Sequence, residues 1–352
     1  MQKPIKLGNF MHGEGEMGWA WWHENHSELA IIGSTQTDRK ALTRSLRELM
    51  ASSDSVDVYS ITAAAPSMGG VHSVDAIPWV EEFSDPPEIF NDRESFINNR
   101  QFFSNAYFNL YSKIIGVDRK DMIPSIRFKP HLGGPLVGYY EAIESLAEDV
   151  SYKLVLKNAF DEIKYINWVE LKNGEKHIYL NPQNTIYEQA LSLLKGVWSF
   201  FCYTCKTEDA KQIAYYVELP RSFFSPGVDP MVTDIMIECL RILKEIAITT
   251  TTTIIVSSDY LFPIPELHFR FKLLFLTEDS DINIVDDPNA DMLIDSTLLA
   301  EWRNQNPSAA LWMDDYTSDI NSARIPVLIS PSGVEFWKED DDTYFNTDGN
   351  LV

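Results

Sequence analysis

The segment Gly33–Lys40 follows an apolar strand pattern and precedes a helix pattern, which is the position of a phosphate-binding loop. Such a loop needs a second glycine, then Lys, then Ser or Thr, so that backbone N–H groups and one ammonium hold the phosphates. Asp38, Arg39 and Lys40 occupy those three places. Because the missing glycine stiffens the turn and Asp38 brings negative charge to the place of a phosphate, we expect no nucleotide here and interpret the segment as a helix start.

Two histidines, His23 and His26, stand three positions apart in a Trp-rich stretch. With His12 or His72 as a third ligand and Glu24 as a base, they could form the metal centre of a hydrolase. The zinc-protease motif needs its histidines at i and i+4, and this pair does not have that spacing. We therefore expect a Trp-rich turn or edge strand over a core, and keep a metal-dependent hydrolase that uses His23, His26 and carboxylates as the alternative function.

Two further motifs are incomplete. Cys202 and Cys205 form a CxxC pair at the far end of an apolar helical run, whereas redox pairs lie at a helix N-terminus, where the dipole lowers the thiol pKa. Asp279 begins a segment similar to a calcium loop, but Ile284 and Ala290 replace its glycine and its glutamate. We expect buried structural cysteines and no bound metal, and the sequence predicts no cofactor.

Strand and helix patterns alternate along the chain. The strand patterns cover 28–33, 56–63, 212–219, 249–256 and 268–276, and the helix patterns cover 37–53, 95–116, 185–205 and 231–247. They predict an α+β (mixed α/β) fold in which a mixed β-sheet packs with helices, with two similar strand–helix halves near 28–53 and 212–247 as an open alternative. We expect an N-terminal α/β region at 1–150 and a C-terminal α+β region with an acidic face at 151–352, or one continuous domain.

Two hairpins are predicted. Asn173-Gly174 separates two alternating runs within 165–180, and this dipeptide supplies the positive φ angles of a tight turn. The segment 326–337 predicts a final hairpin that turns at Ser332-Gly333.

The charge balance restricts the partners. Among 352 residues, 52 are Asp or Glu and 29 are Lys or Arg, for a net charge of −23. A surface this acidic repels nucleic acids and anionic lipid head groups, so we expect no nucleic-acid and no membrane partner. The sequence shows no apolar run of a secretion signal or membrane span, and three cysteines do not make a disulfide framework. We expect a cytoplasmic protein.

The segment 277–352 is the most acidic part, with 17 acidic and three basic residues. Aromatic residues stand among the carboxylates, and such a mixture is typical of a contact surface, where aromatics anchor a partner and charges speed the encounter. The predicted partner-binding residues are Trp312, Asp314, Asp315, Tyr316, Trp337, Glu339, Asp340, Asp341 and Asp342, with Trp79 on a long loop. A place in the core is an equally good interpretation for Trp312 and Trp337.

These features favour a non-enzymatic acidic binding protein that neutralises a basic partner protein. Bacterial immunity proteins and antitoxins, which inhibit a secreted toxin effector by occluding its active site, fit this character because they are acidic, lack catalytic motifs and need no cofactor. Since no complete catalytic motif is present, we expect no enzyme. A structural adaptor of a larger complex is a further alternative.

Overall fold

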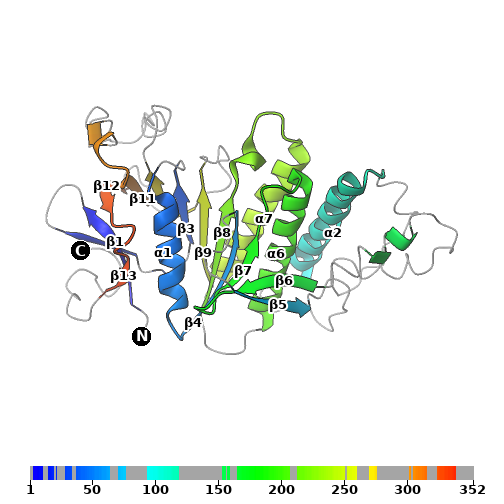
Figure 1. The fold of residues 1–352 in the computed structure, drawn as a ribbon, viewed down its shortest axis with the longest axis horizontal. Helices are drawn as coiled ribbons and strands as arrows, with labels where there is room; N and C mark the ends of the chain where they lie inside the picture. The colour runs from blue at the N-terminus through cyan, green and yellow to red at the C-terminus, as the bar shows by residue number, and fades with distance from the viewer. Residues whose placement is uncertain are drawn as a thin grey trace.

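The computed structural model has a single mixed β-sheet with helices on both faces (Figure 1). Among the described residues the sheet has 13 strands in the order β13-β1-β12-β11-β10-β3-β9-β8-β4-β7-β6-β5, and β2 pairs with β1 outside this path. The structure describes residues 3–10, 15–19, 21, 28–33, 37–63, 70–76, 93–118, 153–155, 157–158, 165–206, 212–249, 252–259, 269–275, 301–302, 304–314 and 323–337. The predicted α+β fold is confirmed.

The strands in the middle of the sheet run parallel. They are β10 (Phe271–Phe275), β3 (Glu28–Ile32), β9 (Thr252–Ser258), β8 (Gln212–Leu219), β4 (Val56–Thr62) and β7 (Lys176–Tyr179). Every residue of β8 and β9 is buried, because both faces of the sheet are covered there. Strands in this setting form continuous apolar runs without alternation, as the sequence shows. Their carboxyl ends meet at one side of the sheet, which we call the carboxyl edge.

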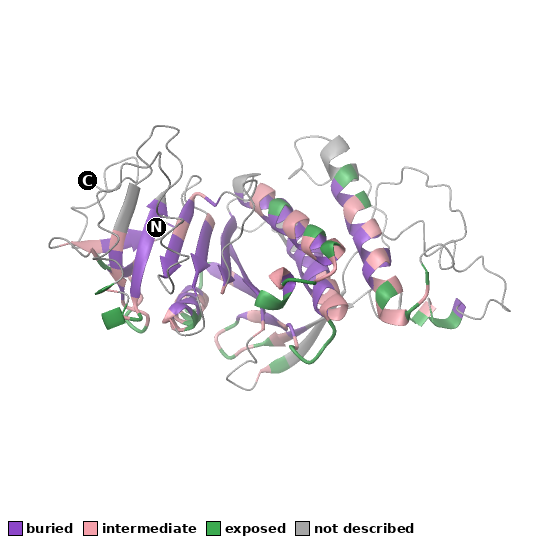
Figure 2. Ribbon diagram, turned by 90° about the horizontal axis from the view of Figure 1, so that it is seen from above, coloured by how far each residue is buried: buried purple, intermediate pink, exposed green. Residues whose placement is uncertain are grey.

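The helices divide between the two faces. They are α1 (Arg39–Ala51), α2 (Arg93–Ile115), α6 (Ile186–Lys206) and α7 (Pro230–Thr249). Consecutive residues of β3 show the division, because they point to opposite faces of the sheet. Ile31 packs into the core that contains α1, and Ile32 packs into the core that contains α2, α6 and α7. Figure 2 shows the central strands almost entirely buried, while the helices keep an exposed outer side.

The chain path reverses at β3. The chain leaves β3 through α1 and enters β4, which lies beyond β9 and β8 in the sheet. It later returns through β8, α7 and β9, and places β10 on the other side of β3. The strand–helix units β3–α1 and β8–α7 therefore share one sheet and cover opposite faces, and strands from both halves of the chain alternate in it.

One end of the sheet is antiparallel. It consists of β11 (Ala309–Asp314), β12 (Ala323–Ile329), β1 (Ile5–Phe10), β13 (Glu335–Phe336) and β2 (Glu16–Trp19). The predicted hairpin at 326–337 is wrong, because β1 lies between β12 and β13 and pairs with both. The N–H groups of Ser330 and Trp337 donate to the carbonyls of Leu7 and Pro4, at 3.0 and 2.8 Å. A strand from the far end of the chain has replaced the local pairing.

The hairpin of β6 (Tyr165–Glu170) and β7 is confirmed, and β5 (Val71–Ala76) continues the sheet beyond it. Within this turn only Gly174 has a positive φ, at 84°, and no non-glycine residue among those described has one. Gly174 N–H donates to the carbonyl of Leu171, and Leu171 N–H donates to that of Glu175, both at 2.9 Å. The turn is thus a longer one with glycine alone in the left-handed conformation.

No helix among the described residues is long and apolar enough to span a membrane. The predicted position of the CxxC pair at the end of a helix is confirmed, because α6 ends at Lys206.

Candidate functional site

The junction between β3 and α1 lies at the carboxyl edge of the sheet. Gly33 N–H donates to the carbonyl of Ser258 on β9, at 3.0 Å. A Cβ at Gly33 would lie 2.6 Å from the Cβ of Phe275 on β10, closer than real Cβ atoms approach. Glycine is therefore required here by the close approach of the neighbouring strand, and the chain leaves β3 tightly enclosed between β9 and β10.

Arg39, the first residue of α1, is 1% exposed and points onto the sheet. Its Nη1 donates to Ser257 Oγ at 2.5 Å, and its Nη2 lies 3.9 Å from Glu218 Oε1. Its Nε is buried and has no hydrogen-bond partner. Since 3.9 Å is longer than a hydrogen bond, the guanidinium is held by one hydroxyl and a nearby charge and keeps N–H donors unused.

The strand register brings these groups together. Glu218 on β8 stands opposite Ser257 on β9, which stands opposite Ile31 on β3. Because side chains alternate between faces, Glu218 and Ser257 share the face of Tyr216 and Ile255, which pack in the core that contains α1. A cation, a carboxylate and a hydroxyl thus meet where parallel α/β sheets bind ligands, outside the carboxyl ends of the strands.

The residues beside Arg39 complete the junction. The Asp38 carboxylate accepts a hydrogen bond from the Ser308 hydroxyl and makes no capping bond to the first turn of α1. Asp38 N–H donates to the carbonyl of Pro307 at 3.4 Å. Lys40 is exposed. The first N–H groups of α1 are therefore uncapped by Asp38, and uncapped N–H groups at a helix N-terminus attract anions.

A second buried cluster lies two turns further along α1. Arg47 Nη1 donates to Glu175 Oε1 at 2.9 Å, the Ser60 hydroxyl donates to the same oxygen, and Ser60 Oγ lies 2.9 Å from His177 Nδ1. Glu175, Ser60 and His177 are at most 2% exposed. Burial raises the pKa of Glu175, but the His177 imidazole, the Arg47 charge and the Ser60 hydroxyl more than offset this, so the pKa lies below its ordinary value.

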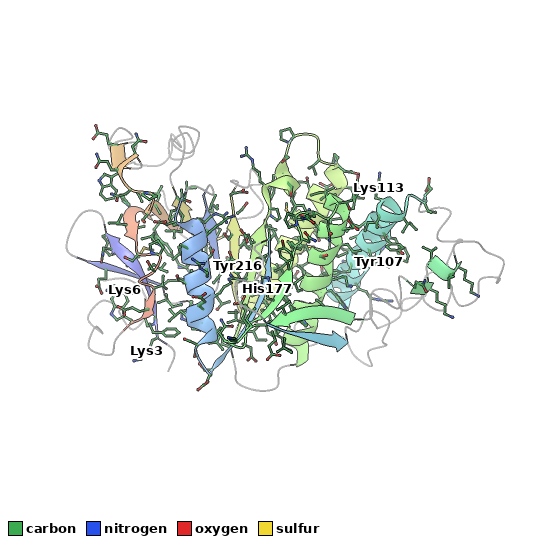
Figure 3. The ribbon with its side chains drawn as sticks, in the orientation of Figure 1. Lys3, Lys6, Tyr107, Lys113, His177 and Tyr216 are labelled. Carbon is green, nitrogen blue, oxygen red and sulfur yellow. The ribbon has the colours of Figure 1, made fainter. Side chains whose placement is uncertain are left out.

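Tyr216 lies between the two clusters. The Arg47 guanidinium carbon is 5.0 Å from the centre of its ring, and Figure 3 shows Tyr216 and His177 beside α1. Burial and the charge of Glu218 raise the pKa of Tyr216, which keeps its hydroxyl neutral. Tyr216 therefore separates the two arginine–glutamate pairs without adding a charge.

Of the predicted partner-binding residues, the structure describes Trp312 and Asp314 on β11 and Trp337 after β13. Trp312 is 6% and Trp337 5% exposed, in agreement with the core interpretation, and Trp312 stacks on Phe271 with ring centres 5.1 Å apart. Asp314 ends β11. The others lie outside the described residues, namely Trp79, Asp315, Tyr316, Glu339, Asp340, Asp341 and Asp342.

The proposed metal ligands His23 and His26 also lie outside the described residues. Within the described part of the chain, no three His, Cys, Asp or Glu side chains gather closely enough to hold a metal ion.

Comparison with known proteins gives a fold relationship. No family model matches the sequence, and the search of curated proteins found no match. Among solved structures, the chain is similar to VirB4 of Thermoanaerobacter pseudethanolicus, with a TM-score of 0.56 and 14% identity, over 93% of this chain and 96% of that one. The similarity covers nearly the whole of both chains, so the two share a fold.

Two further structures are more distant. The pCW3 conjugation coupling protein TcpA with ATPgS has a TM-score of 0.38 and 9% identity, over 96% of this chain and 68% of that one. EssC (ATPases 2 and 3) from Geobacillus thermodenitrificans has a TM-score of 0.35 and 12% identity, over 96% of this chain and 45% of that one.

The prediction of an immunity protein or toxin inhibitor is wrong, because the chain has the fold of VirB4. The expectation of no enzyme is wrong for the same reason, since it rested on the absence of complete motifs from the sequence. Motif matching tests residue identities at fixed spacing and does not test the fold.

Sequence reasoning found the junction at Gly33–Lys40 but missed Glu218 and Ser257. The available indication was that two apolar strand patterns end in polar residues, Glu218 on β8 and Ser257-Ser258-Asp259 on β9. Polar residues at the carboxyl ends of neighbouring parallel strands lie close together. Which strands are neighbours depends on the strand order of the sheet, and the sequence alone does not give that order.

Proposed function

We propose that this chain binds a nucleoside triphosphate at the carboxyl edge of the sheet, with the phosphates at the β3–α1 junction and Arg39 as the cation that contacts them. The observation that carries the proposal is the position of Arg39. It stands at the lysine place of a phosphate loop, at the start of the helix that follows a central parallel strand.

The surroundings of Arg39 support an anionic ligand. The backbone N–H groups at the start of α1 are uncapped by Asp38, and the helix dipole adds positive potential there. Gly33 keeps the chain close to β10, which leaves the strand end without a side chain at the first glycine place of the loop. Both features are those by which phosphate loops hold their ligand.

The departures from the motif change the donors but keep a positive charge. A guanidinium offers a planar fork that binds phosphate oxygens in a bidentate manner, where lysine offers a point charge. Asp38, which argued against a nucleotide in the sequence, is engaged by the Ser308 hydroxyl. Its carboxylate is therefore already satisfied in part by the loop before β11.

Binding of ATP, measured by isothermal titration calorimetry, tests the proposal. We expect Arg39→Met to weaken binding by about tenfold or more, which corresponds to a lost charge-assisted hydrogen bond. Arg39→Lys restores the lysine of the motif and is expected to retain binding. Arg44→Met, which removes an exposed arginine from the same helix, is the matched control. Absence of ATP binding, or equal affinity in Arg39→Met, would contradict the proposal.

We also propose that the chain works in the cytoplasm, where ATP is available. The acidic face and its basic protein partner stay a prediction, to be tested by affinity capture from the native cell with mass spectrometry. An unchanged on-rate of that partner as salt rises would count against an electrostatic encounter.

A further inference from the structure

We infer that nucleotide binding at this site does not depend on Mg²⁺. The inference rests on the proposed function and concerns the form of the ligand that the site accepts. It follows from two positions, the residue after Arg39 and the carboxylate that faces Arg39.

The residue after Arg39 is the first position. In P-loop NTPases a Ser or Thr hydroxyl directly after the lysine holds Mg²⁺. Here that place belongs to Lys40, whose exposed ammonium is a donor without an acceptor oxygen and repels a divalent cation. Lys40 can contact phosphate oxygens, but it removes the side-chain ligand that the motif gives to the metal.

The carboxylate is the second position. P-loop NTPases supply an acidic side chain as the other protein ligand of Mg²⁺. Glu218 is the carboxylate that faces Arg39, at 3.9 Å, and its side chain is 10% exposed. Because the pair is buried, a metal ion that takes Glu218 as ligand must first separate it from Arg39, which leaves a buried guanidinium without its counter-charge.

The charges of the junction lead to the same expectation. Ser308 engages Asp38, and Glu218 lies 3.9 Å from Arg39, so the exposed Lys40 and the start of α1 add positive charge to the unused donors of Arg39. The positive charge that a phosphate loop receives from Mg²⁺ is here supplied by the chain. We therefore expect free ATP and the magnesium complex of ATP to bind with similar affinity.

The test is a calorimetric titration of the full chain with ATP, once in EDTA and once in excess Mg²⁺. For the unaltered chain we expect affinities that agree within about threefold. Lys40→Thr restores the hydroxyl of the motif at an exposed position and is expected to make binding at least about fivefold stronger with Mg²⁺ than without. Arg44→Thr, which removes a positive charge one turn further along α1, is the control and is expected to show no dependence on Mg²⁺.

The outcomes separate the inference from the proposed function. ATP binding by the unaltered chain that requires Mg²⁺ would overturn the inference and leave the proposed function intact. Absence of ATP binding in both buffers would overturn both. A Mn²⁺ titration followed by electron paramagnetic resonance gives an independent readout, since we expect ATP on the protein to immobilise no more Mn²⁺ than free ATP does.

Discussion

Helix α1 holds two arginines two turns apart, Arg39 buried and Arg47 half-buried, and a glutamate lies opposite each of them. Arg47 bonds Glu175 at 2.9 Å, within a network that includes Ser60 and His177. Arg39 lies 3.9 Å from Glu218 and bonds only a hydroxyl of the sheet. The Nε of both guanidinium groups has no hydrogen-bond partner. The two pairs therefore differ in whether the carboxylate accepts a hydrogen bond from the guanidinium, as Glu175 does and Glu218 does not.

The position of each pair along the helix explains this difference. Glu175 lies on the hairpin turn of β6 and β7, where its carboxylate is enclosed by three partners. Glu218 is the last but one residue of β8, at the carboxyl edge, where parallel sheets bind ligands. In the same helix, Arg47 therefore fixes the packing through a hydrogen-bonded carboxylate, while Arg39 keeps unused donors at the edge where we propose the ligand.

The largest expected effect is on stability at Arg47. Arg47→Met keeps much of the apolar stem but leaves the buried Glu175 without its cation, and we expect a loss of about 3 kcal/mol of unfolding free energy. Urea denaturation followed by circular dichroism measures it, with exposed Arg44→Met as control. A loss below about 1 kcal/mol would show that Ser60 and His177 suffice to hold the carboxylate.

The stabilisation of the chain by ATP is a smaller effect, and it distinguishes a role of Arg39 in binding from a role of Arg47 in packing. At a free ATP concentration one hundred times the dissociation constant, ATP is expected to add about 2.7 kcal/mol to the stability of the unaltered chain. The same increment is expected in Arg47→Met, whereas in Arg39→Met at the same ATP concentration a tenfold weaker affinity reduces it to about 1.4 kcal/mol or less. Denaturation with and without ATP measures both increments, and equal increments in the two variants would remove the distinction between the arginines.

The pH dependence of stability sharpens the description of the Arg47 pair. Because the pKa of Glu175 is lower in the folded chain than in the unfolded chain, its contribution is present above the unfolded value, about 4.3, and is lost as the pH falls through the folded value. Glu175→Gln is therefore expected to flatten the decline of stability in acid. If the urea midpoints of both proteins decline by the same amount between pH 6 and 3, this account is contradicted.

The smallest expected effect concerns Glu218. Glu218→Gln keeps the shape of the side chain but removes a negative charge next to Arg39, so we expect ATP to bind about threefold more tightly. Calorimetry at low salt measures the gain, and Glu238→Gln on the outer side of α7, where Glu238 pairs with Arg241, is the control. A weaker affinity in Glu218→Gln would indicate that this carboxylate positions Arg39 for the phosphates.

Much of the fold could be predicted because it depends on local patterns. β8 was predicted at the bounds it has, and α1, α2, α6 and α7 were each predicted within two residues at both ends. These elements are long and apolar, and their periodicity persists over several turns or residues. The pairing of β1 with both β12 and β13 was missed, because the contact joins opposite ends of the chain and no local pattern records it.

The candidate site could be predicted only in part for the same reason. Gly33 and Arg39 belong to one short segment, so sequence reasoning found them. Glu218 and Ser257 reach Arg39 from strands that follow it by about 180 and 220 positions, and their placement depends on the order of β3, β9 and β8 in the sheet. For Trp312 and Trp337 the sequence left a contact role and a place in the core open, and both side chains are buried.

A crystal structure of the full chain with a non-hydrolysable ATP analogue, grown in EDTA, tests the central claim most directly. The account predicts the phosphates at the start of α1, beside Gly33, with an oxygen at about 3 Å from the guanidinium of Arg39 and with the Arg47–Glu175 pair unchanged. An analogue bound elsewhere on the molecule, or no bound analogue at saturating concentration with Arg39 still on Ser257, would contradict it.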